Sequence, residues 1–380
     1  MREFITGNQA VVRAAIRAGC NFFAGYPITP ASSILTEFVK AFAGGRGVIV
    51  QTEDEIAAIG QCIGAAMAGA KALTASSGPG LSLYSENIGL AQMAETPLVI
   101  VDCQRMGPST GGATATGEGD VLFARYVTGG GYPLPVLSAG DAETAYRLTF
   151  DAFNIAERYR TPVILLSSKD VALTRQTVDL DAVTPPALVE RDSLTSGDGD
   201  GWEGPYAVGR PADIPRFAPL GGDTLVRVTG SIHDERGVLT NDRSKIQAKL
   251  THLVEKIERN AEAMERFDAD IDPGADTLII CYGGTEGAVR EAVDTLRREG
   301  AGVSRLTLHT LWPIARKAIR EAITPNVRRI VMPELNIGLY ADALQGVVAP
   351  KRIESIRRYD GGLIAPETIC EHLCEEAITR

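Results

Sequence analysis

The sequence lacks the features of membrane, secreted and nucleic-acid-binding proteins. No apolar run approaches the roughly 18 residues that a membrane span requires, and the residues after Met1 do not lead from a basic segment into an apolar stretch, as a secretory signal does. Lysine and arginine total 38 against 48 aspartates and glutamates, and no basic block could neutralise a row of phosphates. We therefore expect a cytoplasmic protein that binds neither membranes nor nucleic acid.

Cysteine is scarce as well. The six cysteines are scattered, mostly inside apolar runs, and they form no iron–sulfur motif. Cys370 and Cys374, with His372 between them, are spaced to share one helix face, but a structural metal site needs more ligands than this pair supplies. We expect reduced, structural thiols and no metal bound by this chain.

What the sequence does contain is the pattern of a large α/β protein. At 380 residues the chain exceeds the usual size of one hydrophobic core, so more than one domain is expected. Short apolar strands alternate with segments of helical apolar spacing, which predicts a largely parallel sheet. A stretch rich in Pro, Gly and Asp ends this pattern, and a second βα alternation begins near Ala275. We predict a first domain at residues 1–182, a connector with an amphipathic helix at 183–272, and a second domain at 273–380.

The second half of the chain gives three further predictions. Residues 225–228 are expected to form a strand, and residues 242–267 a charged amphipathic helix. The second domain, expected to be an independent Rossmann-like unit, opens with a turn at 282–287 whose glycines resemble a phosphate loop. Their spacing is not G-x-G-x-x-G, so tight packing of a strand against a helix explains them more simply than a dinucleotide does.

Four loops of the first domain follow predicted strands, and each could bind a ligand. The segment 25–30, G-Y-P-I-T-P, is stiff because Pro27 and Pro30 fix φ on either side of Ile28 and Thr29. Stiff backbone at the carboxyl end of a strand is placed where open α/β sheets bind ligands. The alternative is a rigid strand-to-helix turn whose second proline opens the helix.

The second loop brings three acids to a predicted helix start, at residues 53–55. Acids there complement the helix dipole and could act only as caps. Glu55, however, leads directly into a helix face of Ala, Ile and Gly. A partly buried carboxyl at that position would be suited to proton transfer near neutral pH.

The third and fourth loops offer hydrogen-bond donors. Residues 74–80, T-A-S-S-G-P-G, open a helix with free backbone N–H groups, which could cradle an oxyanion or phosphate or form a plain glycine-rich turn. Arg105 follows the strand predicted at 97–103 and could hold a substrate carboxylate by two parallel hydrogen bonds, although surface arginines are common. All four loops leave the carboxyl ends of strands in one predicted sheet, so we expect them to converge on one crevice.

In order and spacing, these segments resemble the α subunit of the 2-oxoacid:ferredoxin oxidoreductases, most closely the 2-oxoglutarate:ferredoxin oxidoreductase (2-oxoglutarate synthase) branch with separate subunits. The resemblance covers nearly the whole chain and includes the segments 156–163 and 229–237. His233, in the second of these, is assigned no role, because a polar turn explains that segment equally well. The loop at 112–120 departs from the family's Pro-Thr and Gln-Asp pattern, which bears on the substrate more than on the reaction.

The resemblance implies a fold and a set of site residues. The fold is α/β, with a parallel-sheet domain that binds the pyrimidine half of thiamine diphosphate and a C-terminal Rossmann-like domain of the transketolase-C type. Glu55 would hydrogen-bond the pyrimidine and favour the imino form that takes the proton from thiazolium C2. Thr29 would lie beside the substrate, and Arg105 would face its carboxylate. The residues expected to contact the cofactor are Tyr26, Pro27, Ile28, Glu55, Ser77 and Gly78.

The implied reaction is the oxidative decarboxylation of a 2-oxoacid with coenzyme A. The expected substrate is 2-oxoglutarate, and the products would be succinyl-CoA, CO2 and reduced ferredoxin. Three alternatives stay open: the same reaction on an aryl or branched-chain 2-oxoacid, a non-redox thiamine-dependent decarboxylase subunit, and a non-catalytic nucleotide-binding scaffold subunit.

The resemblance also implies partner subunits. Gly197-Asp198-Gly199 is similar to the Gly-Asp-Gly motif that holds the diphosphate through a metal, but no apolar strand precedes it and the next asparagine, Asn241, lies beyond the connector. We therefore expect a β subunit to carry the diphosphate site with its Mg2+ and a [4Fe-4S] cluster. Some members of the family also have small γ and δ chains.

Overall fold

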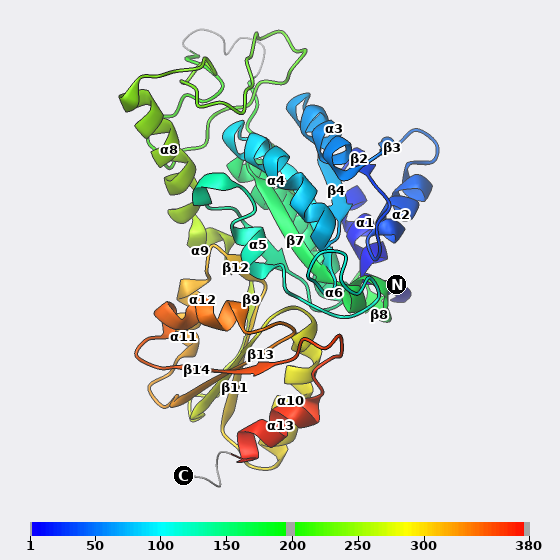
Figure 1. The fold of residues 1–380 in the computed structure, drawn as a ribbon, viewed down its shortest axis with the longest axis vertical. Coiled ribbons are helices and arrows are strands. Elements are labelled where there is room, and N and C mark those ends of the chain that lie inside the picture. The colour runs from blue at the N-terminus through cyan, green and yellow to red at the C-terminus, as the bar shows by residue number, and fades with distance from the viewer. Residues whose placement is uncertain (1, 195–201, 376–380) are drawn as a thin grey trace.

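The computed structural model describes residues 2–194 and 202–375, which form two α/β domains and a long connector (Figure 1). In Figure 1 the connector lies at the top, the C-terminal domain at the bottom and the first domain between them. The Gly197-Asp198-Gly199 segment lies outside the described residues. Within the described ranges, no helix has the length and apolar character needed to cross a membrane.

The sheet of the first domain has seven strands in the order β12-β6-β7-β5-β4-β2-β3. They are β12 (Thr310–Trp312), β6 (Val136–Ser138), β7 (Pro162–Ser168), β5 (Leu98–Gln104), β4 (Ala72–Ser76), β2 (Phe22–Gly25) and β3 (Val48–Gln51). Every pair is parallel except β12 with β6. β5 and β7 are buried along their whole length, which explains their nearly continuous apolar sequences, LVIVDCQ and PVILLSS.

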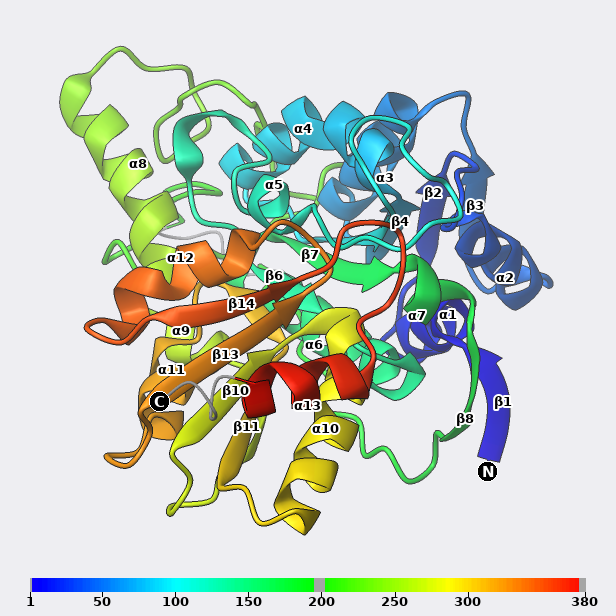
Figure 2. The same cartoon turned by 60° about the horizontal axis from the view of Figure 1, so that its bottom comes forward.

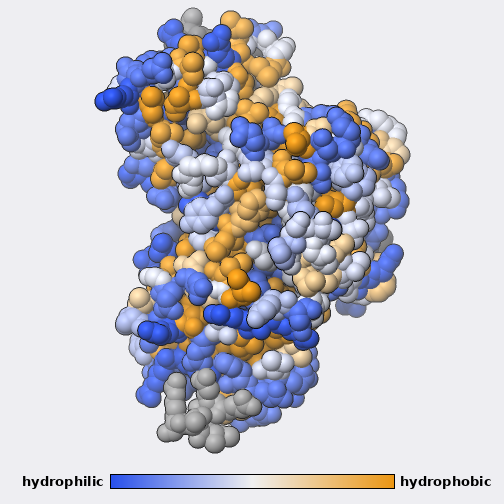
Figure 3. Space-filling view, viewed as in Figure 1, coloured by the Kyte–Doolittle hydropathy of each residue, from blue (hydrophilic) through white to orange (hydrophobic). Residues whose placement is uncertain are grey.

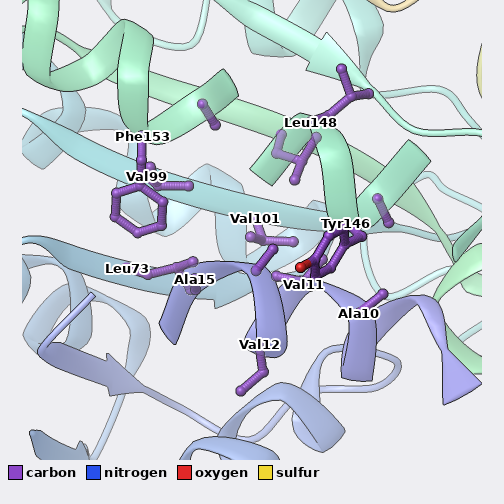
Figure 4. Close-up of a cluster of buried hydrophobic side chains, with 14 of the residues drawn as sticks. Ala10, Val11, Val12, Ala15, Leu73, Val99, Val101, Tyr146, Leu148 and Phe153 are labelled. Atoms are coloured by element: carbon purple, nitrogen blue, oxygen red, sulfur yellow. The ribbon is translucent and has the colours of Figure 1, made fainter. Parts of the chain in front are cut away.

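Helices cover both faces of this sheet. One face carries α1 (Gly7–Arg17), α2 (Ser32–Phe42) and α6 (Ala142–Tyr159), and the other carries α3 (Glu55–Met67) and α4 (Gly78–Met93). Side chains alternate along β5, so Val99 and Val101 join the cluster with α1 and α6 in Figure 4, whereas Leu98 and Ile100 face α3 and α4. The shorter elements are β1 (Arg2–Thr6), paired with β8 (Arg175–Asp179), and the helices α5 (Val121–Arg125) and α7 (Lys169–Leu173).

The C-terminal sheet has five strands in the order β14-β13-β10-β11-β9 (Figure 2). They are β14 (Ile353–Arg357), β13 (Arg329–Glu334), β10 (Thr277–Cys281), β11 (Val303–Leu308) and the antiparallel edge strand β9 (Phe267–Asp270). One face packs on α10 (Glu286–Arg298) and α13 (Pro366–Glu375), and the other on α11 (Arg316–Ala322) and α12 (Leu339–Val348). This is the Rossmann-like arrangement that the second βα alternation predicts.

The second domain is not independent of the first, contrary to expectation. β12 follows β11 in the chain but leaves the second sheet and pairs with β6 at the edge of the first. One buried apolar cluster also extends from α3 and α4 into the second domain, where Leu278, Trp312 and Tyr340 belong to it. The two domains therefore share a strand and a core.

Two predictions for the connector are wrong. Residues 225–228 form no strand, because they pair with no neighbouring strand, and Leu225 is 97% exposed. Patches of apolar surface lie in the upper part of Figure 3, where Figure 1 shows the connector. The helix predicted at 242–267 ends early, since α8 (Arg243–Glu258) is followed by α9 (Ala261–Met264), and Phe267 begins β9. Pairing of β9 with β11 overrides the helical pattern there.

α8 also buries charged side chains that its sequence would place in water. Lys249 Nζ, His252 Nε2 and Lys256 Nζ lie 2.6, 2.8 and 2.7 Å from the carboxylate of Glu95, which follows α4 and is fully buried. Burial opposes ionisation, but these three partners hold the pKa of Glu95 well below its ordinary value. We call these four residues the Glu95 cluster. It fastens the connector helix to the first domain.

Candidate functional site

The strand order of the first sheet reverses at β2, because β3 and β4 lie on opposite sides of it. Open α/β sheets bind ligands at such a point, where the loops diverge beyond the carboxyl ends of the strands. Tyr26 follows β2, Thr52 follows β3, Ser77 follows β4 and Arg105 follows β5. The structure thus brings the four predicted loops to one edge of the sheet.

The segment 25–30 is held by hydrogen bonds near both ends. The Thr52 N–H donates to the Gly25 carbonyl at 3.1 Å, and the Asn8 side chain donates to the Pro30 carbonyl at 2.9 Å. Asn8 is fully buried in α1. The sequence analysis did not single out Asn8. A polar residue beside the buried apolar face of a helix is the signal that could have identified it, because a buried polar side chain needs a hydrogen-bond partner.

Glu55 begins α3 and is buried, with 6% exposure. The preceding Asp54 caps the helix, because its carboxylate accepts the Ala57 N–H at 2.7 Å. The first turn of α4 lies close by: a Cβ on Gly80 would lie 2.8 Å from Glu55 Oε1 and 2.0 Å from Ser76 Oγ. Only glycine permits this approach. The predicted second and third loops therefore meet at the Glu55 carboxyl group.

Arg105 and Thr29 are in direct contact. The Nη1 atom of Arg105 donates to the Thr29 carbonyl at 2.6 Å, although the two residues come from different loops. Arg105 is 7% exposed, and its Nε atom has no acceptor among the described residues. The guanidinium is thus fixed at one corner and keeps hydrogen-bonding capacity for a ligand.

Two serine hydroxyls at the end of β4 also lack partners. Ser76 Oγ and Ser77 Oγ are buried and form no hydrogen bond within the part of the chain that the structure describes. Buried polar atoms are normally paired, so such hydroxyls mark a place where a bound molecule can supply the missing partner. They lie next to the Gly78–Gly80 start of α4.

Two acids in this region were missed by sequence analysis. Asp102 lies in β5 and is fully buried, and its carboxyl group contacts that of Asp120, which precedes α5. The Asp120 N–H donates to Gln104 Oε1 at 3.0 Å. An aspartate inside the apolar run of β5 was the available signal for Asp102.

The loop that leads from Arg105 to Asp120 is clamped by the C-terminal domain. The Glu118 N–H donates to the Leu335 carbonyl at 2.9 Å, and Asn336 Nδ2 donates to the Glu118 carbonyl at 2.9 Å. The Gly284 N–H donates to Glu118 Oε1 at 2.7 Å. Gly283 has a φ of +55°, and a Cβ there would lie 2.6 Å from the Glu118 carboxylate. The glycine turn at 282–287 therefore holds a carboxylate of the same chain.

The remaining candidates lie elsewhere. Cys370 and Cys374 are both on α13 in the C-terminal domain. His233 packs on the Tyr206 ring at 4.2 Å between centroids, and its Nδ1 bonds the Ser231 carbonyl at 2.8 Å. Over residues 2–194 and 202–375, no group of three or more His, Cys, Asp or Glu side chains could hold a metal ion.

Family models match both halves of the chain. Residues 13–271 match the family described as pyruvate flavodoxin/ferredoxin oxidoreductase, thiamine diphosphate-binding. Residues 275–369 match the pyruvate:ferredoxin oxidoreductase core domain II.

Full-length relatives agree with these matches. The chain is 38% identical over 371 residues to the 2-oxoglutarate synthase subunit KorA of Methanothermobacter marburgensis, with 96% of each chain covered. It is 32% identical over 381 residues to the ketoisovalerate oxidoreductase subunit VorB of Methanothermobacter thermautotrophicus, which covers 99% of this chain and 98% of that one.

Solved structures share the fold. The 2-oxoglutarate:ferredoxin oxidoreductase from Magnetococcus marinus, with 2-oxoglutarate, coenzyme A and succinyl-CoA bound, has a TM-score of 0.91 at 32% identity. The match covers 99% of this chain and 65% of that chain, so the present chain spans about two thirds of the solved one. A split gene transketolase, at 13% identity and a TM-score of 0.51, shows likeness of fold alone. The predicted fold class is confirmed.

Proposed function

The chain belongs to the 2-oxoacid:ferredoxin oxidoreductase family, and we propose that it is the α subunit of an enzyme acting on 2-oxoglutarate. The reaction is CoA-dependent oxidative decarboxylation to succinyl-CoA and CO2, with reduction of ferredoxin. The observation that carries the proposal is the Arg105–Thr29 contact at 2.6 Å, at the same sheet edge as the buried Glu55 carboxyl group. At that edge, the Arg105 guanidinium is available to bind a substrate carboxylate, and the Glu55 carboxyl group is available to bind the ring of the cofactor.

The residues present fit the pyrimidine half of thiamine diphosphate. The buried Glu55 carboxyl group and the unpartnered Ser76 and Ser77 hydroxyls suit a planar, polar ring. When bound, the cofactor supplies the electron sink for decarboxylation. The residues that would hold it are Tyr26, Pro27, Ile28, Glu55, Ser77 and Gly78.

Three side chains or backbone groups have separate roles in this proposal. Glu55 would hydrogen-bond a ring nitrogen of the bound pyrimidine and share a proton with it. Arg105 binds the carboxylate next to the reacting carbonyl, since a guanidinium matches a carboxylate by two parallel hydrogen bonds. Thr29 fixes the guanidinium through its carbonyl and lies beside the substrate. The burial of Glu55 and Arg105 strengthens both interactions, because less water competes for them.

The choice of 2-oxoglutarate rests on the relatives. Four 2-oxoglutarate synthase subunits are 34–38% identical to this chain, and VorB is 32% identical over almost its full length. The second candidate is therefore the same reaction on a branched-chain 2-oxoacid. An aryl 2-oxoacid and a non-redox decarboxylase are weaker alternatives, because the relatives described above are named for 2-oxoglutarate and ketoisovalerate.

We further propose that a β subunit shares the cofactor. It would hold the diphosphate with Mg2+ and carry the [4Fe-4S] cluster, with γ and δ chains in some complexes. The subunit names of the relatives support a multi-subunit enzyme. We also propose domain limits of 1–182, 183–272 and 273–380; the family matches, which end at residue 271 and begin at residue 275, support the last of these boundaries. The complex would work in the cytoplasm.

The test is to co-express the chain with its partner subunits, purify the complex and assay a panel of 2-oxoacids with coenzyme A and a viologen dye. We expect CoA-dependent dye reduction, with the highest kcat/KM for 2-oxoglutarate and succinyl-CoA as the product. Higher kcat/KM with 2-oxoisovalerate would assign the branched-chain activity instead. Decarboxylation without dye reduction would overturn the oxidoreductase proposal.

A further inference from the structure

Two carboxyl groups lie together behind Arg105. Asp102 sits in the middle of the first sheet, opposite Ser76 of β4 and Leu166 of β7. Alternation along β5 turns its side chain toward the face that carries α4, the face of Leu98 and Ile100. A Cβ on Gly78, the first residue of α4, would lie 3.0 Å from Asp120 Oδ2. The two acids therefore meet under the first turn of α4.

This carboxyl pair has almost no other hydrogen-bond partners. Both oxygens of Asp102 and the Oδ2 atom of Asp120 are buried and find no donor in the described part of the chain. Two buried carboxylates in contact repel each other, and neither can donate a hydrogen bond while ionised. A hydrogen bond between them forms only if one of them keeps its proton.

The charge around the pair comes chiefly from Arg105. The guanidinium interacts electrostatically with both acids, yet no described carboxylate forms a direct ion pair with it. The other titratable groups nearby are the buried Cys103 thiol on the same strand and Glu55 beyond Gly80. Gly78 and Ser76, the closest residues of α4 and β4, carry no charge.

We propose that Asp102 and Asp120 share a single proton, and that the one negative charge left on the pair makes them positioning residues for Arg105. With one proton, the pair and the guanidinium together are neutral, so Arg105 is held without losing its attraction for a substrate carboxylate. With none, two negative charges behind Arg105 would repel that carboxylate. The role in substrate binding rests on the proposed function, whereas the shared proton does not.

The direction of the pKa shift of each group agrees with this assignment. Burial, reinforced by the neighbouring Asp120, raises the pKa of Asp102 well above its ordinary value. Burial also raises the pKa of Asp120 to about 6, against the opposing effects of the Asp102 hydrogen bond and Arg105. Of the two groups, Asp102 therefore retains the shared proton more readily, and the negative charge lies more on Asp120.

The proposal predicts that the double variant changes the KM for the 2-oxoacid much more than either single variant does. In Asp102→Asn or Asp120→Asn, the amide supplies the donor and the remaining aspartate carries the charge, so the KM for the 2-oxoacid should stay within about threefold of the wild-type value. In Asp102→Asn/Asp120→Asn the charge is lost, and the unbalanced guanidinium should lower this KM by about tenfold or more. If each substitution only disturbed the structure locally, the effects of the two substitutions on KM would instead add. Asp294→Asn, on the exposed face of α10, is the matched control.

The shared proton is tested directly by infrared difference spectroscopy on the purified complex. Wild type minus Asp102→Asn should show one protonated-carboxyl band that shifts in D2O, and wild type minus Asp294→Asn should show none. Absence of the band, or a large KM change in one single variant with no further change in the double variant, would overturn the proposal. If the complex turns over no 2-oxoacid, the proposed function fails, but the infrared result still decides the proton sharing.

Discussion

The Gly284 N–H donates a hydrogen bond of 2.7 Å to Glu118 Oε1, and this bond joins the C-terminal domain to the loop that begins at Arg105. Glu118 is buried between the domains, near Ser168, Asp170 and Glu334. The carboxyl group thus lies where a change in its charge affects both the domain contact and the path to the site.

The domain contact should weaken as the pH rises. Burial, with help from the Asp170 and Glu334 carboxylates, raises the pKa of Glu118 to about 7, from an ordinary value of 4.5. A raised carboxyl pKa stabilises the fold fully below about pH 4.5, and this contribution is lost as the pH rises through 7, amounting to about 3 kcal/mol. In Glu118→Gln the contribution of Glu118 to this dependence should vanish. Urea unfolding of both proteins at pH 5, 6, 7 and 8 should show the variant gaining stability over the wild type as the pH rises.

The control for this experiment is Glu291→Gln on the exposed face of α10. Burial also raises the pKa of Glu286, at the same domain contact, to about 7, so the wild-type profile has a second contributor. Parallel profiles for the wild type and Glu118→Gln would show that Glu118 does not carry the pH dependence.

Arg105→Lys should impair substrate binding more than turnover. Lysine keeps the charge but lacks the planar fork, so it cannot both donate to the Thr29 carbonyl and hold a carboxylate by two parallel bonds. Losing one charge-assisted hydrogen bond costs about 1.5–3 kcal/mol, so we expect the KM for 2-oxoglutarate to rise roughly 10- to 100-fold. Steady-state assays of the complex measure this. Arg298→Lys, on the exposed side of α10, should leave the KM unchanged.

Gly80→Ala should displace Glu55. The added Cβ would lie 2.0 Å from Ser76 Oγ and 2.8 Å from Glu55 Oε1, so one of these groups must move. We expect the affinity for thiamine diphosphate to fall by at least about tenfold, since one hydrogen bond to a charged group is worth that much. Calorimetric titration of the complex measures it. Gly346→Ala in α12, where the Cβ meets no atom within 4 Å, should bind the cofactor normally.

Glu95→Gln should be one of the most destabilising single changes in the first domain. It removes the counter-charge of Lys249 and Lys256, both of which are buried. Removing one partner of a buried charge network typically costs about 3–5 kcal/mol. Urea unfolding should show this loss, whereas Glu86→Gln on the exposed face of α4 should change the stability by less than about 0.5 kcal/mol. Similar stabilities of the two variants would contradict the large contribution to the free energy of unfolding that we assign to the Glu95 cluster.

Elements were predictable where the residues that determine them lie within the element or next to it in the sequence. A helix opening after Pro30 was one interpretation of the segment 25–30, and α2 begins at Ser32, because Pro30 and the apolar spacing mark its start and buried face within the segment itself. The convergence of four loops on one edge also followed from the βα alternation alone. A parallel sheet aligns the carboxyl ends of its strands wherever each strand is placed in the order.

Features that depend on distant partners were not predictable. The three residues of β12 form a strand only because β6, more than 170 positions earlier, offers an edge. The charged face of α8 is buried because Glu95 meets it, and no periodicity in the helix reports that. Asp102 and Asp120 become a pair only when β5 and the start of α5 are brought together.

The position of β12 limits how the chain could be divided into two separate polypeptides. A polypeptide ended at residue 272 would contain every other strand of the first sheet, yet β6 would be left as a bare edge, open to pairing with a second molecule. Dividing the reading frame at that point should therefore yield fragments that aggregate unless both are made together. Evolution could separate the two halves only by first supplying another cover for β6.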